Sequence, residues 1–117
     1  MELAITTRSV NDYKVVTVAG EIDIFTAPQL RENLVELLDA GQLYIVVDLL
    51  RVDFLDSTAL GVLVGIHRRV SPSGGALNLV CIKPHILKMF RISGLDQTFA
   101  ISPTVEQAAA ERDGDAR

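Results

Sequence analysis

Carboxylate and hydroxyl side chains gather in residues 52–61, VDFLDSTALG. An apolar run that predicts a buried strand precedes this segment, and residues with helical spacing follow it. Loops at the carboxyl ends of strands often form binding sites, and the free amides of a helix start favour negative charge. If Asp56 caps that helix, the Ser57 hydroxyl stays free to face solvent and to carry phosphate. On the residues alone, Asp56-Ser57-Thr58 is either a plain polar cap or such an acceptor site.

Asp48 is the alternative phosphate acceptor. A response-receiver domain has a similar length and alternation, and it phosphorylates an aspartate beside a magnesium ion that an acidic cluster after the first strand holds. Here the first strand ends in residues 7–10, TRSV, while Glu21 and Asp23 follow the second strand. Asp48 also lies within an apolar run with no loop directly after it. The pattern therefore argues against an Asp48 receiver, which stays as an alternative hypothesis, and leaves the role of Ser57 open.

No signature of an enzyme or of a cofactor site is present in the sequence. The chain lacks GxSxG, P-loop and GxGxxG motifs, and neither His67 nor His85 has a partner at metal-ligand spacing. Fifteen acidic residues against 11 basic ones give a net charge of −4, which argues against nucleic acid or an anionic membrane as partner. With no membrane-spanning run and no signal peptide in the sequence, we expect a cytoplasmic protein whose partner is another protein or a small molecule.

The elements expected to hold these residues form one α/β domain. The 117 residues, 49% of them apolar, suffice for a single core. Periodicity and breaker residues predict a hairpin over 3–10 and 14–20, a helix over about 26–41, strands over 43–50, 77–82 and 99–102, and helices over about 56–69, 84–94 and 103–111. This order implies a mixed sheet of about five strands with about four helices, in a domain over 1–111 with a flexible polar tail over 112–117.

Two further features bear on packing. Gly61 and Gly65 lie four residues apart in the second expected helix, which predicts close packing of that helix against the sheet. Cys81 is the single cysteine and stands among apolar residues, so we expect it in the core.

Several motifs together resemble the anti-sigma factor antagonists, members of the STAS domain family. The DSTA sequence of residues 56–59 is similar to that family's Asp-Ser-Ser/Thr-Gly phosphorylation motif, with Ala59 in place of glycine. The resemblance extends over about residues 3–109 and includes GEID at 20–23, APQL at 27–30, VVDL at 46–49 and FRISGL at 90–95. Ala59 could limit how closely a partner backbone approaches the helix start.

The resemblance implies a STAS fold and a partner switch. The unphosphorylated domain would bind an anti-sigma factor that is also a serine kinase, and phosphorylation of Ser57 would separate the two proteins. A PP2C-like serine phosphatase would reverse the modification. The residues expected to meet the partner are Asp23, Asp56, Ser57, Thr58, Ala59, Leu60 and Gly61. A STAS binding module without phosphorylation remains a further alternative.

Overall fold

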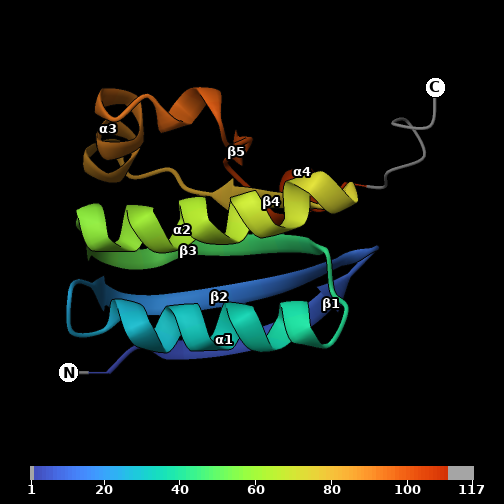
Figure 1. Ribbon diagram of the computed structural model, residues 1–117. Helices are drawn as coiled ribbons and strands as arrows, with labels where there is room; N and C mark the ends of the chain where they lie inside the picture. Colours follow the sequence, from blue (N-terminus) through green and yellow to red (C-terminus); the bar gives the residue numbers. More distant parts are fainter. Residues whose placement is uncertain (1, 111–117) are drawn as a thin grey trace.

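The computed structural model describes residues 2–110 and contains one five-stranded sheet with helices on both faces (Figure 1). The strands lie in the order β1-β2-β3-β4-β5. The first pair is antiparallel and the later pairs are parallel. The elements are β1 (Ala4–Val10), β2 (Tyr13–Ile22), α1 (Ala27–Asp39), β3 (Tyr44–Leu55), α2 (Ser57–Val70), β4 (Ala76–Val80), α3 (Pro84–Ile92), β5 (Ile101–Ser102) and α4 (Val105–Ala108), with short 3-10 turns at Ser71–Ser73 and Leu95–Gln97.

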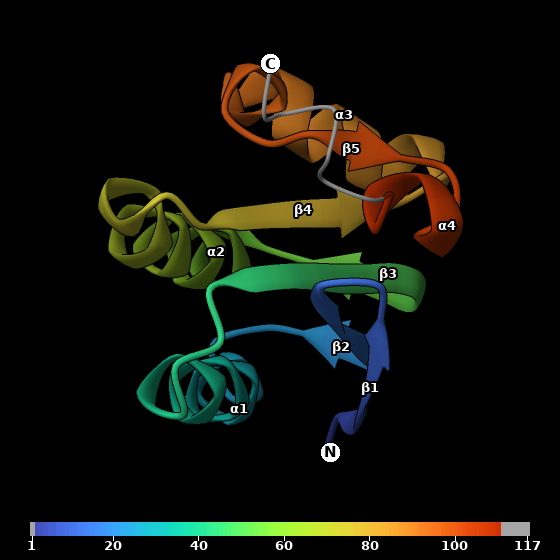
Figure 2. The ribbon, with the colours of Figure 1, turned by 90° about the vertical axis from the view of Figure 1, so that its right-hand side faces the viewer.

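The two faces of the sheet are covered unequally. α1 and α2 lie on one face, whereas the single-turn helix α4 lies on the other (Figure 2). The larger core includes Leu34 of α1, Leu63 of α2 and Phe90 of α3. A smaller core under α4 joins Tyr13, Val46 and Val105 among others. Because α4 has four residues, part of the sheet on its side stays open.

Most expected elements are confirmed, with shifts in length. β3 continues to Leu55, five residues past the expected end at residue 50, because β2 still pairs with it there. The last helix is shorter than expected, and its predicted end at residue 111 lies outside the described residues, as do the tail residues 112–117 and the expected domain boundary. Cys81 is buried as expected, and burial raises the pKa of its thiol.

The prediction that Gly61 and Gly65 pack against the sheet is wrong. Both are exposed, and a Cβ atom added to either would have no neighbour within 4 Å. The inward stripe of α2 consists instead of Ala59, Leu60, Leu63, Ile66 and Val70. The two glycines fall outside this stripe and face away from the sheet.

Candidate functional site

The loops that carry Asp23 and Ser57 are neighbours at the carboxyl ends of β2 and β3. Ile22 pairs with Leu55 in the last step of this parallel ladder. Beyond it, the backbone amide of Asp56 donates a hydrogen bond to the carbonyl of Ile22 at 3.2 Å. The two loops therefore leave the same edge of the sheet, in line with the expected position of binding sites in such folds.

Asp56 caps α2, as expected. Its backbone is extended, with φ −117° and ψ −172°, and its Oδ1 accepts from the backbone amides of Thr58 at 2.9 Å and Ala59 at 3.3 Å. This geometry engages the carboxylate with the first free amides of the helix. Ser57, the first helical residue, is exposed, and its hydroxyl makes no hydrogen bond within the described part of the chain. The hydroxyl is thus open to a reagent or to a partner.

Asp23 organises the loop between β2 and α1. Its Oδ1 accepts from the backbone amides of Phe25 at 2.9 Å and Thr26 at 3.0 Å, and these bonds lower the pKa of the carboxyl. Thr26 occupies the N-cap position of α1, yet its side chain does not cap that helix. Instead its hydroxyl donates to the carbonyl of Glu21 at 2.7 Å and accepts from the amide of Asp23 at 2.9 Å. These bonds hold the loop closed on itself.

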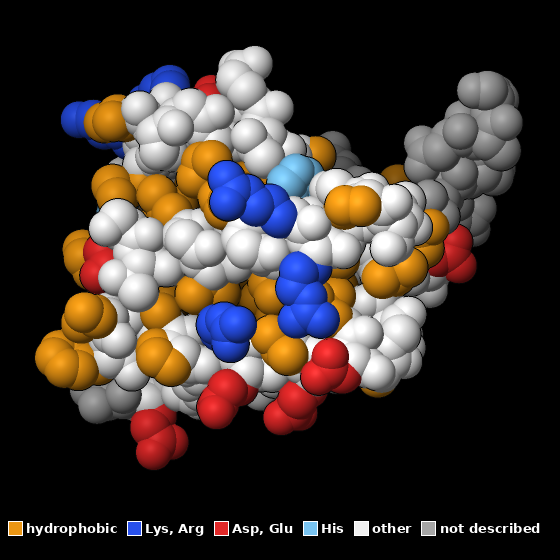
Figure 3. Space-filling model, in the orientation of Figure 1, with side chains coloured by type: hydrophobic (Ala, Val, Ile, Leu, Met, Phe, Trp, Pro, Cys, Tyr) orange, Lys and Arg blue, Asp and Glu red, His pale blue; other side chains and the backbone are white. Residues whose placement is uncertain are grey.

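Large apolar side chains surround this end of the molecule, which the motif-based reasoning missed. Ile24 and Phe25 in the first loop are 64% and 86% exposed, Phe54 before the second loop is 47% exposed, and Ile82 after β4 is 57% exposed. Figure 3 shows hydrophobic side chains gathered at the left-hand end of the molecule, where these loops lie in Figure 1. The sequence feature that could have predicted these exposed side chains is the pair Ile24-Phe25, which stands in a turn where polar residues are usual. We call Ile24, Phe25 and Phe54, which flank the two loops, the apolar rim; Ile82 lies outside it, because β4 stops pairing with β3 at Asp48.

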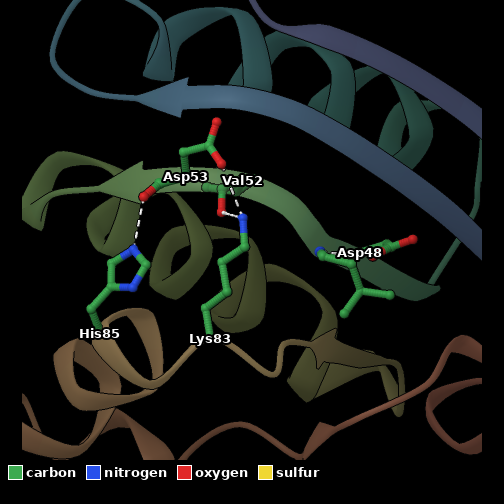
Figure 4. Close-up of polar contacts among 6 residues, drawn as sticks. Asp48, Val52, Asp53, Lys83 and His85 are labelled. Atoms are coloured by element: carbon green, nitrogen blue, oxygen red, sulfur yellow. Dashed lines mark hydrogen bonds and ion pairs between the residues drawn. The ribbon is translucent and has the colours of Figure 1, made fainter.

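A polar latch ties the segment before Ser57 to the start of α3 (Figure 4). β4 pairs with β3 only as far as Asp48, so the later backbone of β3 lacks that neighbour. Lys83 Nζ donates to the carbonyl of Val52 at 2.7 Å and to Asp53 Oδ1 at 3.1 Å. The His85 ring donates through Nε2 to the carbonyl of Asp53 at 2.8 Å. The latch replaces the missing strand partner and fixes the end of β3 that precedes Ser57.

The sequence and the fold both match known proteins. The family model of the STAS domain matches residues 4–108. The chain belongs to the STAS domain family. It is 41% identical over 91 residues to the anti-sigma-B factor antagonist of Bacillus subtilis, which covers 78% of this chain and 83% of that protein. It therefore belongs to the anti-sigma factor antagonists within the STAS family, whose members regulate by binding and are not enzymes.

The fold of this chain is also similar to solved structures of anti-sigma factor antagonists. The crystal structure of an anti-sigma factor antagonist from Mycobacterium paratuberculosis has a TM-score of 0.86 and 30% identity, with 95% of each chain covered. The phosphorylated form of a Bacillus cell fate determinant has a TM-score of 0.70 and 24% identity, and covers 97% of this chain and 100% of that one. At 24% identity, the comparison with the Bacillus protein shows a shared fold and no more.

The STAS motif residues do not all reach the surface. Ser57 and Gly61 are exposed and Asp56, Thr58 and Asp23 are partly exposed. Ala59 and Leu60 are buried, with 0% and 7% of their surface exposed. The methyl group of Ala59 points into the core and so does not limit the approach of a partner. We had expected such a limit because Ala59 stands in place of glycine.

The surroundings of Asp48 differ from those of a receiver aspartate. It lies inside β3, is 7% exposed, and accepts from the Leu50 amide at 3.0 Å and the Thr17 hydroxyl at 3.3 Å. Residues 2–110 contain no group of three acidic, histidine or cysteine side chains that could hold a metal ion. In the same range, no helix has both the length and the hydropathy to cross a membrane.

Proposed function

We propose that this chain binds an anti-sigma factor when Ser57 is unmodified, and that phosphorylation of Ser57 ends the binding. The observation that carries the proposal is the exposed Ser57 hydroxyl, unbonded at a helix start whose cap is already supplied by Asp56. The name of the Bacillus subtilis relative supports the choice of partner. The solved phosphorylated form of the Bacillus cell fate determinant supports the mode of control.

The apolar rim supplies the attraction between the two proteins. Exposed apolar side chains next to one another favour association because burial removes them from water. Aromatic residues such as Phe25 and Phe54 are typical anchors at the centre of an interface. Phe25, at 86% exposed, can bury nearly all of its side chain against a partner.

Phosphate acts in opposite directions on the fold and on the interface. It adds about −1.5 to −2 charges. At the amino end of α2 this charge is favoured by about 0.3 to 1 kcal/mol. At the interface, a like charge about 4 Å away repels by roughly 1 to 4 kcal/mol, and burial of an ion beside the apolar rim adds a desolvation cost. Binding should weaken by about one to three decades while the domain stays folded.

The switch we propose needs two more proteins besides the sigma factor. The anti-sigma factor is also the serine kinase that modifies Ser57. By phosphorylating the antagonist bound to it, the anti-sigma factor therefore frees itself from this antagonist. A PP2C-like serine phosphatase removes the phosphate and restores binding. Because sigma factors act on RNA polymerase, we place the cycle in the cytoplasm. We propose that the STAS domain over residues 1–111 is the unit that acts in this cycle.

The decisive experiment combines phosphate mapping with binding. The protein is incubated with candidate anti-sigma kinases and ATP, and the phosphate is located by mass spectrometry. We expect it on Ser57. Phosphate on Asp48 would instead support the receiver hypothesis, and none with a kinase that binds the chain would support a STAS module without phosphorylation.

Binding is then measured with that kinase for two Ser57 variants. Ser57→Ala should keep binding in the presence of ATP, and Ser57→Asp should bind at least tenfold more weakly with a nearly unchanged melting temperature. Ser73→Asp is the matched control, since Ser73 is exposed beyond the other end of α2. Equal affinities of Ser57→Ala and Ser57→Asp would refute the switch.

A further inference from the structure

A polar groove lies on the sparsely covered face of the sheet, away from α1 and α2. It has a volume of about 560 Å³ and is bounded by strand residues on one side and by the segment 103–106 at the start of α4 on the other. Its polar lining consists of Thr6, Arg8, Thr17, Asp48, Arg51, Thr104 and Glu106. We propose that this groove binds a small oxyanion ligand, a phosphate monoester or a carboxylic acid in its ionised form, that also carries hydroxyl or amino groups.

Strand register assembles the floor of the groove. Thr6 of β1 pairs with Thr17 of β2, which in turn pairs with Asp48 of β3. Side chains of residues directly opposite one another in a sheet share one face. The three residues therefore form a polar row across the sheet, and the Thr17 hydroxyl bonds to Asp48 Oδ2 at 3.3 Å.

A β-bulge turns Arg51 into the groove. Between the pairs Thr17–Asp48 and Ala19–Arg51, β3 advances three residues while β2 advances two. Without the extra residue, Arg51 would point to the face opposite Asp48. Asp48 Oδ1 accepts from the amide of Leu50 at 3.0 Å, within the bulge. The buried carboxylate thus stabilises the irregular backbone that aims Arg51.

The cationic groups of the groove have no partner among the described residues 2–110. Arg8 and Arg51 are exposed, and neither forms an ion pair or side-chain hydrogen bond among residues 2–110. Each guanidinium can donate two parallel hydrogen bonds to one phosphate or carboxylate group. The hydroxyls of Thr6 and Thr104 can add further donors.

Two carboxylates define the rest of the ligand. Asp48 at the floor and Glu106 at the edge accept hydrogen bonds and repel a bare anion. A ligand with its oxyanion at the arginines and a hydroxyl or amino group at Asp48 or Glu106 satisfies both charges. The volume of the groove is in the range of small-molecule sites, about 300 to 1,000 Å³. This inference does not depend on the proposed function of Ser57, which lies at the carboxyl ends of the strands.

An NMR titration of the full chain at constant ionic strength tests the proposal. The probes are glycerol 3-phosphate, glycerate, inorganic phosphate and glycerol. We expect saturable shifts at the amides of Thr6, Thr17, Arg51 and Thr104, with glycerol 3-phosphate or glycerate binding more tightly than phosphate and glycerol not binding. The tighter of the first two probes tells whether the site prefers phosphate or carboxylate.

Single substitutions then assign the arginines. Arg8→Gln and Arg51→Gln should each weaken binding about tenfold, since hydrogen bonds to a charged group are lost. Arg51→Lys, which keeps the charge but not the paired donors, should give an intermediate loss and guards against misfolding of the glutamine variant. Arg68→Gln on α2 is the control and should bind normally. Three results would overturn the proposal and indicate an adventitious ion only. They are an absence of saturable binding, a loss of binding in Arg68→Gln equal to that in the groove variants, and amide shifts confined to residues 57–60.

Discussion

At the scale of single residues, Asp56 and Asp23 use the same chemistry for different ends. Each carboxylate accepts from backbone amides two and three residues later. Asp56 starts a long helix and leaves the next hydroxyl free. Asp23 instead closes a loop whose two following side chains, Ile24 and Phe25, are directed to solvent. One aspartate thus leaves the proposed phosphate acceptor free, and the other holds the loop that presents Ile24 and Phe25 of the apolar rim.

The hydrogen bonds of Asp23 predict how its carboxyl group titrates at acid pH. The amides of Phe25 and Thr26 lower the pKa of its carboxyl, so they bind the charged form. A group whose pKa is lowered by folding stabilises the fold fully above its unfolded pKa of about 3.9, and this contribution is lost as the pH falls through the lower folded value. We expect the Asp23 carboxyl carbon to titrate below about 3.9 in an NMR experiment. In Asp23→Asn the shift of the Phe25 amide with acid should disappear; a midpoint at or above the ordinary value would contradict the assigned bonds.

At the scale of elements, the exposed glycines of α2 weaken a helix that carries the candidate site. Glycine in a helix interior costs about 0.5 to 1 kcal/mol relative to alanine. Added Cβ atoms at Gly61 and Gly65 would meet nothing, so Gly61→Ala and Gly65→Ala should each raise the free energy of unfolding by about that amount.

Gly75 provides the contrast for this prediction. A Cβ atom there would collide with the backbone carbonyl of Leu43, so Gly75→Ala should lower the free energy of unfolding. Urea unfolding of the three variants measures both signs. Stabilisation by Gly75→Ala, or destabilisation by Gly65→Ala, would show that α2 or its following turn packs differently.

At the scale of the whole molecule, two cores share one sheet. Leu63 belongs to the larger core, whereas Tyr13 and Tyr44 belong to or border the smaller one. The chain contains two tyrosines and no tryptophan, so tyrosine fluorescence reports only on the face under α4. Unfolding followed by fluorescence therefore tests whether the two faces unfold together.

Leu63→Ala should cost about 2 to 5 kcal/mol by opening a cavity in the larger core. Because β2, β3 and β4 contribute to both cores, we expect tyrosine fluorescence and far-UV circular dichroism to shift to the same lower midpoint. A fluorescence midpoint that stays at the wild-type value would mean that the smaller core unfolds independently.

Much of this architecture follows from local sequence patterns. Helical spacing, breaker residues and the cap at Asp56 predicted α2 to within one residue at each end, because caps and periodicity act over a few residues. The hairpin and the order of helices and strands followed for the same reason. The extra length of β3 was missed because the expected strand was taken from the apolar run that stops at residue 50, whereas residues 51–55 include two charged side chains and pair with β2.

The sequence by itself determined where the chain turns, which residues are apolar enough for a core, and that Ser57 begins a helix behind an aspartate cap. Only the tertiary structure decided that Gly61 and Gly65 face outward, that Ala59 points inward, and that a bulge brings Arg51 beside Asp48. It also decided that the loops of Asp23 and Ser57 adjoin, and that Lys83 bonds to Val52 near the end of β3. The physical reason is range: caps and periods act between near neighbours, whereas facing and adjacency depend on strand register and packing between residues far apart in the chain.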